Sequence, residues 1–488
     1  MLQKGRLRIG IFAGLCSLTI GAVVPAGSAI AGPAPAQERP VYVTNGDETN
    51  DISTFTTDVT TGRPTLNDRL VKAGEGVRQM VFTPDARAGY ASNAGDNTIS
   101  VYSVGQRGRL TPLPGAAGTV RTGGDTPLGI AVPPNGQMVY VAHVFSNSVA
   151  AFTIASDGSL KPFRTTTTSV ANPRGLAVTP NSRFLYVGHG DPGEDRPTSV
   201  GAITAYAINR DGSLTPIGSP IRVGRFCGAL SITPDGHNVY LTCTDTDEIH
   251  GFAIGSDGEL TPLPRSPYAV SDFPEGITTS PDGRFVYTAS VGLGTTPEGP
   301  GAVSAFAIGG DGALTELPGS PIKAGTFPVG ITPLPNGRFL YVSGGDATGE
   351  LNAFAIGDAG TLKPLPGSPF PTGGKWPAYN SASVLPNQGP VADFTTGVDG
   401  RSVTFDASAS TDADGRVARY RWDFGDGTTQ TTTDPRTTHR YPRAGTFRAT
   451  LVVTDNEGCS SAVISTGQAV LCNGTTAATT NHDIVVRG

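Results

Sequence analysis

A tyrosine recurs seven times in this chain at intervals close to fifty residues. The seven are Tyr42, Tyr90, Tyr140, Tyr186, Tyr240, Tyr287 and Tyr341, with spacings of 48, 50, 46, 54, 47 and 54. Residues 274–321 show the repeat best, with predicted strands at 275–280, 285–290, 302–308 and 313–317 joined by Asp-Gly turns. Asp-Gly between β-branched and aromatic runs is a strong hairpin signal. A single four-stranded sheet cannot bury both faces, so the repeats predict an all-β fold, a seven-bladed β-propeller.

The sequence also indicates how the ring closes. The first repeat begins at its second strand, residues 41–45, and lacks an inner strand. A segment with the character of an inner strand follows the seventh repeat at residues 377–385. We therefore expect one blade to be built from both ends of the propeller, residues 40–386.

The N-terminus has the pattern of an export signal. Lys4, Arg6 and Arg8 precede an apolar run, and small residues around residue 30 predict cleavage after Ala31, with Ala36 as the alternative site. A retained membrane anchor is the other interpretation. Residues 32–39 then form a linker, and no membrane span remains after cleavage. Removal of the three basic residues changes the net charge from −6 to −9, which argues against a nucleic-acid partner.

Four cysteines remain in the exported chain, an even number in an oxidising compartment. Cys227 begins the first strand of the fifth repeat and Cys243 ends the second, so a hairpin turn midway places them opposite each other. Cys459 and Cys472 are left for each other. We predict both disulfides, with free buried thiols as the alternative in each case.

After Pro386 the composition changes. Residues 387–390 form a predicted linker, and residues 391–488 contain short alternating strands typical of an immunoglobulin-like sandwich. The strands are expected at 392–395, 402–406, 417–423, 437–441 and 446–454, with a last strand pair at 462–468 and 482–486.

Two repeats carry longer connections between their second and third strands, at residues 189–199 and 291–301. In a propeller these connections share one face with the starts of the inner strands. Insertions confined to one face are typical of a binding face.

Two periodic positions place candidate site residues on that face. Three residues after the repeat tyrosine stand His143 and His189 in adjacent blades, and one residue after the inner-strand start stand Arg78, Arg174 and Glu275. The arginines suit a carboxylate or phosphate ligand. His143, His189 or Glu275 would act as general base on a water that attacks a lactone carbonyl. The alternative is that all five are scattered rim residues.

Familiar catalytic motifs such as G-x-S-x-G, H-E-x-x-H and the phosphate loop are missing from the sequence. We predict no cofactor. Calcium is the one alternative, through Asp412 and Asp414 or through Asp245, Asp247 and Glu248. Ordinary Asx turns account for the same residues.

The propeller resembles the lactonase-like seven-bladed family, which includes bacterial 6-phosphogluconolactonases and has surface-protein relatives with a YVTN repeat. The tetrapeptide YVTN stands at residues 42–45, and the recurring strand phrases PDGRFVY and SAFAI stand at 281–287 and 304–308. The resemblance covers nearly all of residues 40–386. It implies the fold and, as one expectation, hydrolysis of a sugar lactone.

The C-terminal unit resembles a PKD domain. Its hallmark WDFGDG stands at residues 422–427, with FDAS at 405–408 and the H-x-Y-x-x-x-G phrase at 439–445. The resemblance implies that Trp422 fills the sandwich while Asp423 and Asp426 bond turn amides. It also implies a spacer or adhesive module.

Two functions follow as hypotheses. The first is a secreted or cell-surface binding protein whose propeller face binds an extracellular glycan or cell-wall component. The second is a lactone hydrolase, similar to 6-phosphogluconolactonases, that acts on a small lactone. Convergence of Arg78, Arg174, His143, His189 and Glu275 would favour the enzyme.

Overall fold

The computed structural model describes residues 38–487 apart from 47, 68–69, 191–199, 293–300 and 346. The predicted signal segment and most of both predicted insertions lie outside the described residues. Nearly all regular structure is β, with four short 3₁₀ turns at η1 (Gln106–Gly108), η2 (Gly115–Gly118), η3 (Thr244–Thr246) and η4 (Thr476–Ala478). In the described part of the chain no helix is long and apolar enough to span a membrane.

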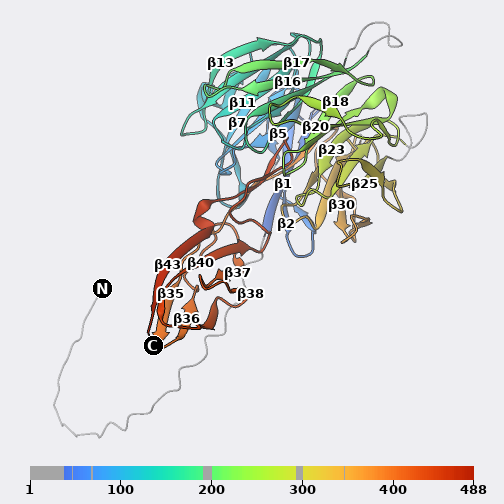
Figure 1. The fold of residues 1–488 in the computed structure, drawn as a ribbon. Coiled ribbons are helices and arrows are strands. Elements are labelled where there is room, and N and C mark those ends of the chain that lie inside the picture. The colour runs from blue at the N-terminus through green and yellow to red at the C-terminus, as the bar shows by residue number, and fades with distance from the viewer. Residues whose placement is uncertain are drawn as a thin grey trace, which may run out of the picture. The chain divides into compact units, whose positions relative to one another are not determined.

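Seven antiparallel sheets form the predicted propeller (Figure 1), and we number its blades in the order of the repeat tyrosines. Blade 1 contains β33 (Pro377–Val384), β1 (Glu38–Asn45), β2 (Asp51–Asp58), β3 (Pro64–Leu66) and β4 (Val71–Lys72). Blade 2 contains β5 (Val77–Phe82), β6 (Ala88–Asn93), β7 (Thr98–Val104), β8 (Leu110–Pro112) and β9 (Thr119–Arg121). Blade 3 contains β10 (Pro127–Ala131), β11 (Met138–His143), β12 (Ser148–Ile154) and β13 (Leu160–Thr167).

The other four blades repeat this order from inner to outer strand. Blade 4 contains β14 (Pro173–Val178), β15 (Phe184–His189), β16 (Ala202–Ile208) and β17 (Leu214–Arg222). Blade 5 contains β18 (Cys227–Ile232), β19 (Asn238–Cys243), β20 (Glu248–Ile254), β21 (Leu260–Pro262) and β22 (Tyr268–Ala269). Blade 6 contains β23 (Pro274–Thr279), β24 (Phe285–Ser290), β25 (Ala302–Ile308), β26 (Leu314–Glu316) and β27 (Ile322–Lys323). Blade 7 contains β28 (Gly330–Pro333), β29 (Phe339–Gly344), β30 (Glu350–Ile356), β31 (Leu362–Pro364) and β32 (Phe370–Pro371).

The ring closes as the sequence predicts. β1 pairs with β33 in antiparallel register, so the first and last strands of the propeller share blade 1. The seven inner strands contact one another in a closed circle, with β33 lying between β28 and β5. Apolar side chains of neighbouring blades pack between the sheets, for example Tyr341 of blade 7 with Val41 and Phe55 of blade 1.

Each repeat tyrosine joins its blade to the next. All seven are fully buried, and each hydroxyl donates a hydrogen bond to a glycine carbonyl in a turn of the following blade. The acceptors have left-handed backbone, with φ between 72° and 88°, and are Gly108, Gly158, Gly212, Gly258, Gly312, Gly360 and Gly62. The last bond, from Tyr341 to Gly62 at 2.6 Å, runs from blade 7 back to blade 1.

The position three residues after the repeat tyrosine ties the second strand to the third within one blade. Asn45 donates to Ser53 of β2 at 2.8 Å, and Asn93 donates to Ser100 of β7 at 3.0 Å. His143 and His189 occupy this position in blades 3 and 4 and contact the third strand of their own blade in the same way. In blade 5 the position is Cys243, which lies opposite Cys227 and forms the predicted disulfide with it.

The two histidines are completely buried. Nδ1 of His143 lies 3.1 Å from the hydroxyl of Ser148 on β12, and Nε2 of His189 lies 2.8 Å from the hydroxyl of Thr204 on β16. Nδ1 of His189 also lies 3.1 Å from the carbonyl oxygen of Ala171. Burial lowers the pKa of each imidazole to about 4, although Asp125 raises that of His143.

The C-terminal sandwich has two facing sheets. One contains β35 (Thr395–Asp399), β36 (Ser402–Asp406) and β39 (Arg436–Arg440); the other contains β38 (Thr429–Thr432), β37 (Val417–Asp423), β40 (Gly445–Asp455) and β43 (Thr479–Val486). Trp422 is fully buried in its core, and Asp423 and Asp426 accept hydrogen bonds from the turn amides of Gly425 and Thr428. These three roles agree with the resemblance.

The predicted last strand pair is wrong. β43 pairs with β40, whereas β41 (Ile464–Ser465) pairs with β42 (Val470–Asn473) in a separate small sheet. That sheet also contains β34 (Asn387–Gln388), which lies within the segment that the sequence assigns to a linker. The hairpin is stapled by the second predicted disulfide, Cys459–Cys472. It departs from the sandwich because its tip packs against the propeller.

The tip of this hairpin meets the ends of two inner strands. The N–H of Ile232, at the end of β18, donates to the carbonyl of Thr466 at 2.8 Å, and the N–H of Val178, at the end of β14, donates to that of Gly467 at 2.9 Å. Thr466 is buried. A Cβ at Gly467 would come 3.0 Å from the Ile232 side chain. The hairpin therefore covers this end of the inner strands in blades 4 and 5.

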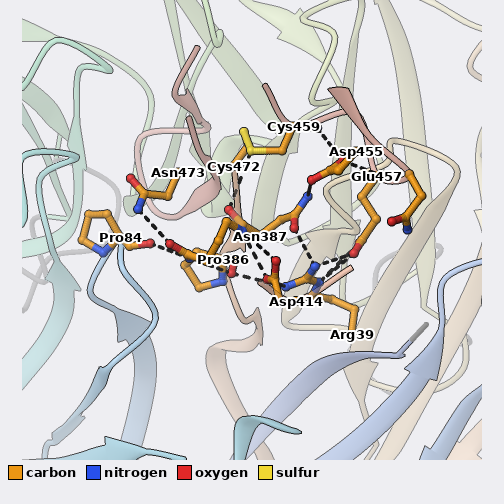
Figure 2. Close-up of polar contacts among 12 residues, drawn as sticks. Arg39, Pro84, Pro386, Asn387, Asp414, Asp455, Glu457, Cys459, Cys472 and Asn473 are labelled. Atoms are coloured by element: carbon orange, nitrogen blue, oxygen red, sulfur yellow. Dashed lines mark hydrogen bonds and ion pairs between the residues drawn. A yellow bond between two sulfur atoms is a disulfide. The ribbon is translucent and has the colours of Figure 1, made fainter. Parts of the chain in front are cut away.

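A second contact joins the same domain to the first strand of the propeller. Arg39 of β1 is buried and donates to Asp414 at 2.7 Å and to Asn387 at 2.7 Å, and its guanidinium is also paired with Glu457 (Figure 2). The amide of Gln388 donates to the carbonyl of Pro84 at 3.0 Å. Removing one member of such a buried pair would leave an uncompensated charge, so loss of either partner is expected to destabilise this contact.

We predict that Tyr341→Phe lowers the free energy of unfolding by about 1–3 kcal/mol, because the carbonyl of Gly62 loses its partner inside the ring. The matched control is Tyr379→Phe, whose hydroxyl has no hydrogen-bond partner among the described residues. Its stability should stay close to that of the original chain. Urea unfolding followed by tryptophan fluorescence measures both variants, and equal losses would contradict the assignment of the ring-closing bond.

The buried histidines predict acid sensitivity. An unfolded histidine takes up a proton near pH 6.5, whereas the folded His143 and His189 do so only near pH 4. The unfolded state therefore binds more protons in this window, and stability falls as pH drops from about 6.5 to about 4, by up to about 3 kcal/mol per histidine.

Asparagine replaces these histidines in blades 1 and 2, which gives a natural test. We expect His143→Asn and His189→Asn to fold, because Asn45 and Asn93 make the equivalent bond. Unfolding free energies measured at pH 7 and pH 4.5 should differ less in the variants than in the original chain. An unchanged difference would show that the imidazoles do not titrate in this way.

The hairpin contact is tested by Gly467→Val against Gly458→Val. Both glycines have left-handed backbone, with φ of 85° and 90°, so both valines suffer the same backbone strain. Only at Gly467 does a Cβ meet the propeller, since nothing lies within 4 Å of a Cβ at Gly458. We expect Gly467→Val to lose at least about 1 kcal/mol more in thermal or urea unfolding. Equal losses would argue against the contact.

Candidate functional site

The starts of the inner strands share an unusual backbone and define one face of the propeller, here called the rim face. The residue before the inner strand in six blades, and the residue three before β28 in blade 7, have left-handed backbone with φ between 44° and 62°: Gly76, Thr126, Asn172, Phe226, Phe273, Phe327 and Trp376. In six blades its carbonyl accepts a hydrogen bond from the N–H that leaves the second strand, as from Thr244 to Phe226 at 3.1 Å. Both periodic positions of the sequence therefore lie at the rim face.

Arg174, the second residue of β14, projects onto aromatic rings from two other blades. Its guanidinium carbon lies 4.0 Å from the ring centre of Phe226 and 5.4 Å from that of Tyr379. Tyr379 belongs to β33 of blade 1, yet a Cβ at Gly228 of β18 would come 2.5 Å from its hydroxyl and 3.3 Å from Nε of Arg174. The missing side chain at Gly228 thus lets a tyrosine reach across the axis to the arginine.

Glu275, the second residue of β23, belongs to the same group. Burial raises its pKa above the usual carboxyl range, Arg174 lowers it, and Asp245 of η3 raises it. Burial likewise raises the pKa of Tyr379, which Arg174 lowers and Glu275 raises. We call Arg174, Phe226, Glu275 and Tyr379 the axial cluster.

The axial cluster combines three chemical abilities. The guanidinium offers planar donors for a carboxylate, a phosphate or a developing oxyanion. A carboxyl group with a raised pKa exchanges protons closer to neutral pH than an ordinary one. The Tyr379 hydroxyl, buried and without a partner among the described residues, offers one further donor.

Of the five residues selected from the sequence, Arg174 and Glu275 are near enough for the guanidinium to lower the pKa of the carboxyl group. Arg78, the second residue of β5, lies where blades 1 and 2 meet: a Cβ at Gly46 would come 2.9 Å from its guanidinium and 3.3 Å from Ala378. His143 and His189 are buried inside their own blades, with partners on the third strands. A catalytic role for the histidines stays a prediction.

Sequence reasoning missed Tyr379 and Phe226. The signal for Tyr379 was present two residues after the inner-strand start of each repeat, a position that reads Gln79, Gly129, Gly175, Ala229, Gly276, Gly330 and Tyr379. Four glycines and one alanine in this set mark a crowded axis, so the tyrosine stands out. Phe226 precedes a strand, at a position that the periodic comparison did not include.

Some of the residues considered for calcium have protein partners, whereas both carboxylate oxygens of Asp412 are buried without a hydrogen-bond partner among the described residues. Asp247 accepts a hydrogen bond from the N–H of Phe273 at 2.9 Å, and Asp414 is paired with Arg39. Burial, together with Asp414, raises the pKa of Asp412 to about 7. Within the described ranges no group of three or more His, Cys, Asp or Glu side chains is placed to hold a metal ion.

Comparison with known proteins agrees with this architecture. The chain resembles a Pseudomonas aeruginosa structure described as the periplasmic gluconolactonase PpgL, with a TM-score of 0.58 and 19% identity over 71% of this chain and 99% of that one. It also resembles a Bacteroides uniformis structure described as a candidate 6-phosphogluconolactonase, with a TM-score of 0.60 and 18% identity over 72% of this chain and 100% of that one. At these identities the likeness shows the fold.

Sequence relatives cover smaller parts. A 6-phosphogluconolactonase of Yersinia pestis is 29% identical over 98 residues, which is 19% of this chain and 28% of that enzyme. A microbial collagenase of Vibrio alginolyticus is 43% identical over 67 residues, which is 14% of this chain and 8% of the collagenase. The chain thus spans 28% or less of the length of these curated relatives.

Two family descriptions match the chain. "Lactonase, 7-bladed beta-propeller" matches residues 40–226, the first part of the propeller. "PKD domain" matches residues 387–470, which include β34 and most of the sandwich. Residues 40–226 thus match the lactonase family of seven-bladed β-propellers, and residues 387–470 match the PKD domain.

Proposed function

We propose that this protein hydrolyses a lactone that carries an anionic group, and that the axial cluster is its active site. The observation that carries the proposal is that Arg174 of blade 4 lies over the ring of Tyr379 of blade 1, with Glu275 of blade 6 near enough to influence the pKa of Tyr379. The match of residues 40–226 to the lactonase family and the lactonase names of the relatives support the reaction class.

The proposed reaction needs only groups of the cluster and water. Ionised Glu275 takes a proton from a water molecule as its oxygen attacks the lactone carbonyl carbon. The guanidinium of Arg174 and the hydroxyl of Tyr379 stabilise the negative charge that develops on the carbonyl oxygen. The ring C–O bond then breaks, and Glu275 returns the proton to the leaving oxygen. The new carboxyl group of the hydroxy acid releases its own proton to water, and the carboxylate remains beside Arg174.

The raised pKa of Glu275 fits this role. A general base works best when its pKa lies near the working pH, and burial moves the carboxyl group in that direction. The acid limb of kcat/KM should consequently lie above the usual carboxyl range. An exported location is part of the proposal, because the N-terminal pattern and two disulfides suit an oxidising compartment.

Binding without turnover is the second candidate. The stacking of Arg174 on Phe226 favours it, because a guanidinium fixed on an aromatic ring is preorganised to hold an anion whether or not chemistry follows. The ligand would then be an anionic extracellular saccharide or cell-wall component. Both candidates use the same cluster, so one set of variants separates them.

We predict proton release above the buffer rate in a pH-stat when the full chain meets 6-phosphoglucono-δ-lactone, and slower release from uncharged glucono-δ-lactone. Glu275→Gln should lower kcat by roughly 10²-fold or more, because the base is lost. Arg174→Met should lower kcat on both lactones, because the guanidinium no longer stabilises the developing oxyanion, and should also remove the preference for the phosphorylated substrate. Tyr379→Phe should lower kcat less, because only one donor is lost.

Matched controls separate the site from surface effects. Arg164→Met removes an arginine that lies 5.7 Å from Phe163 on the outer strand β13, and Glu259→Gln removes an exposed carboxylate. Both should keep full activity. Turnover that survives Glu275→Gln would refute this base, and no turnover on either lactone, with binding of the hydroxy acid retained, would favour the second candidate.

A further inference from the structure

Four consecutive blades place a large aromatic side chain at the same position of the rim face. These residues, here called the aromatic arc, are Phe226, Phe273, Phe327 and Trp376. We propose that the aromatic arc binds the sugar rings of an oligosaccharide whose terminal residue is the lactone. This inference rests on the proposed function and names its substrate class.

The backbone at these positions makes aromatic residues costly. All four have φ between 44° and 57°, a conformation in which a bulky side chain is strained by about 1–2 kcal/mol. The fold does not require them, since Gly76 fills the equivalent position in blade 2. The strain in four successive blades therefore points to a use for the rings themselves.

Folding does not use these rings in a core. None of the four belongs to the buried clusters between the blades, and none is fully buried. Phe273 is 37% exposed. An apolar surface that lies at the edge of a candidate site and outside every described core is available to a ligand.

The arc adjoins the axial cluster at both ends. Phe226 in blade 5 carries the guanidinium of Arg174 on its ring, and Trp376 in blade 1 stands three residues before Tyr379. A ligand held at the axis therefore has aromatic rings beside it. A single sugar ring cannot contact residues from four blades, so the arc fits a longer chain.

The neighbours of the arc favour sugar over an acyl chain. Each ring follows a polar residue, and these residues are Arg225, Asp272, Thr326 and Lys375. A pyranose ring presents a C–H face, which stacks on an aromatic ring, and hydroxyl edges, which need polar partners. A long acyl chain would instead need a continuous apolar surface, and a polar residue next to each ring in the sequence does not supply one.

The test measures binding without reaction. Aldonic acids with one to four sugar units, in β-1,4-glucan, α-1,4-glucan and chitin series, are the ring-opened products and cannot be hydrolysed. We expect isothermal titration calorimetry on the full chain to show affinity that rises with chain length in at least one series. Trp376→Gly and Phe273→Asn should each weaken the binding of the longest acid by roughly threefold to tenfold and leave the binding of the shortest acid unchanged.

The substitutions suit the backbone, because Gly76 and Asn172 occupy the same position in other blades. Phe163→Ala, at an exposed phenylalanine on β13, is the control and should change nothing. Affinity independent of chain length in all three series would overturn the proposal that the arc binds an oligosaccharide. Binding of acyl homoserine lactones that tightens with acyl-chain length would also overturn it.

The two proposals fail separately. Chain-length-dependent binding without lactone turnover would uphold the arc and refute the hydrolase. Turnover of a monosaccharide lactone without any gain from added sugars would uphold the hydrolase and overturn the arc.

Discussion

The hydrogen bond from a buried tyrosine to a glycine carbonyl in the next blade is the contact on which the propeller depends. It occurs at all seven junctions, and each acceptor has left-handed backbone that turns its carbonyl inward. Because the same hydrogen bond is repeated at all seven junctions, each blade is related to the next in the same way. Equivalent residues of different blades therefore lie on one face, which is why residues distant in sequence, such as Arg174 and Tyr379, meet at the axis.

Much of this could be predicted from the sequence because the decisive signals are periodic or local. The tyrosines gave the blade number, the stray segment at 377–385 gave the closure, and a hairpin turn placed Cys227 opposite Cys243. The same periodic comparison selected both Arg174 and Glu275 as candidate site residues. It could not show that His143 bonds within its own blade, because no residue pattern in a single sequence indicates the hydrogen bond to Ser148.

The errors share a physical origin in contacts across the ring or between domains. Tyr379 matters because Gly228, three blades away, has no side chain. The pairing of β43 was mispredicted because the residues before it leave the sandwich and bond to Val178 and Ile232. Burial then sets the chemistry of the cluster: Glu275 holds its proton more tightly than a surface carboxylate. No local pattern in a single sequence carries these three facts.

The hairpin between β41 and β42 has a consequence for how such chains evolve. A module attached by a flexible tether can be duplicated, lost or moved by recombination without harm to its neighbour. In this chain, the hairpin of the PKD domain bonds to the inner strands of the propeller. Glu457 of the same domain pairs with Arg39, near the start of the ring. A propeller separated from this PKD domain would therefore expose the N–H groups of Val178 and Ile232 to solvent and leave Arg39 without Glu457.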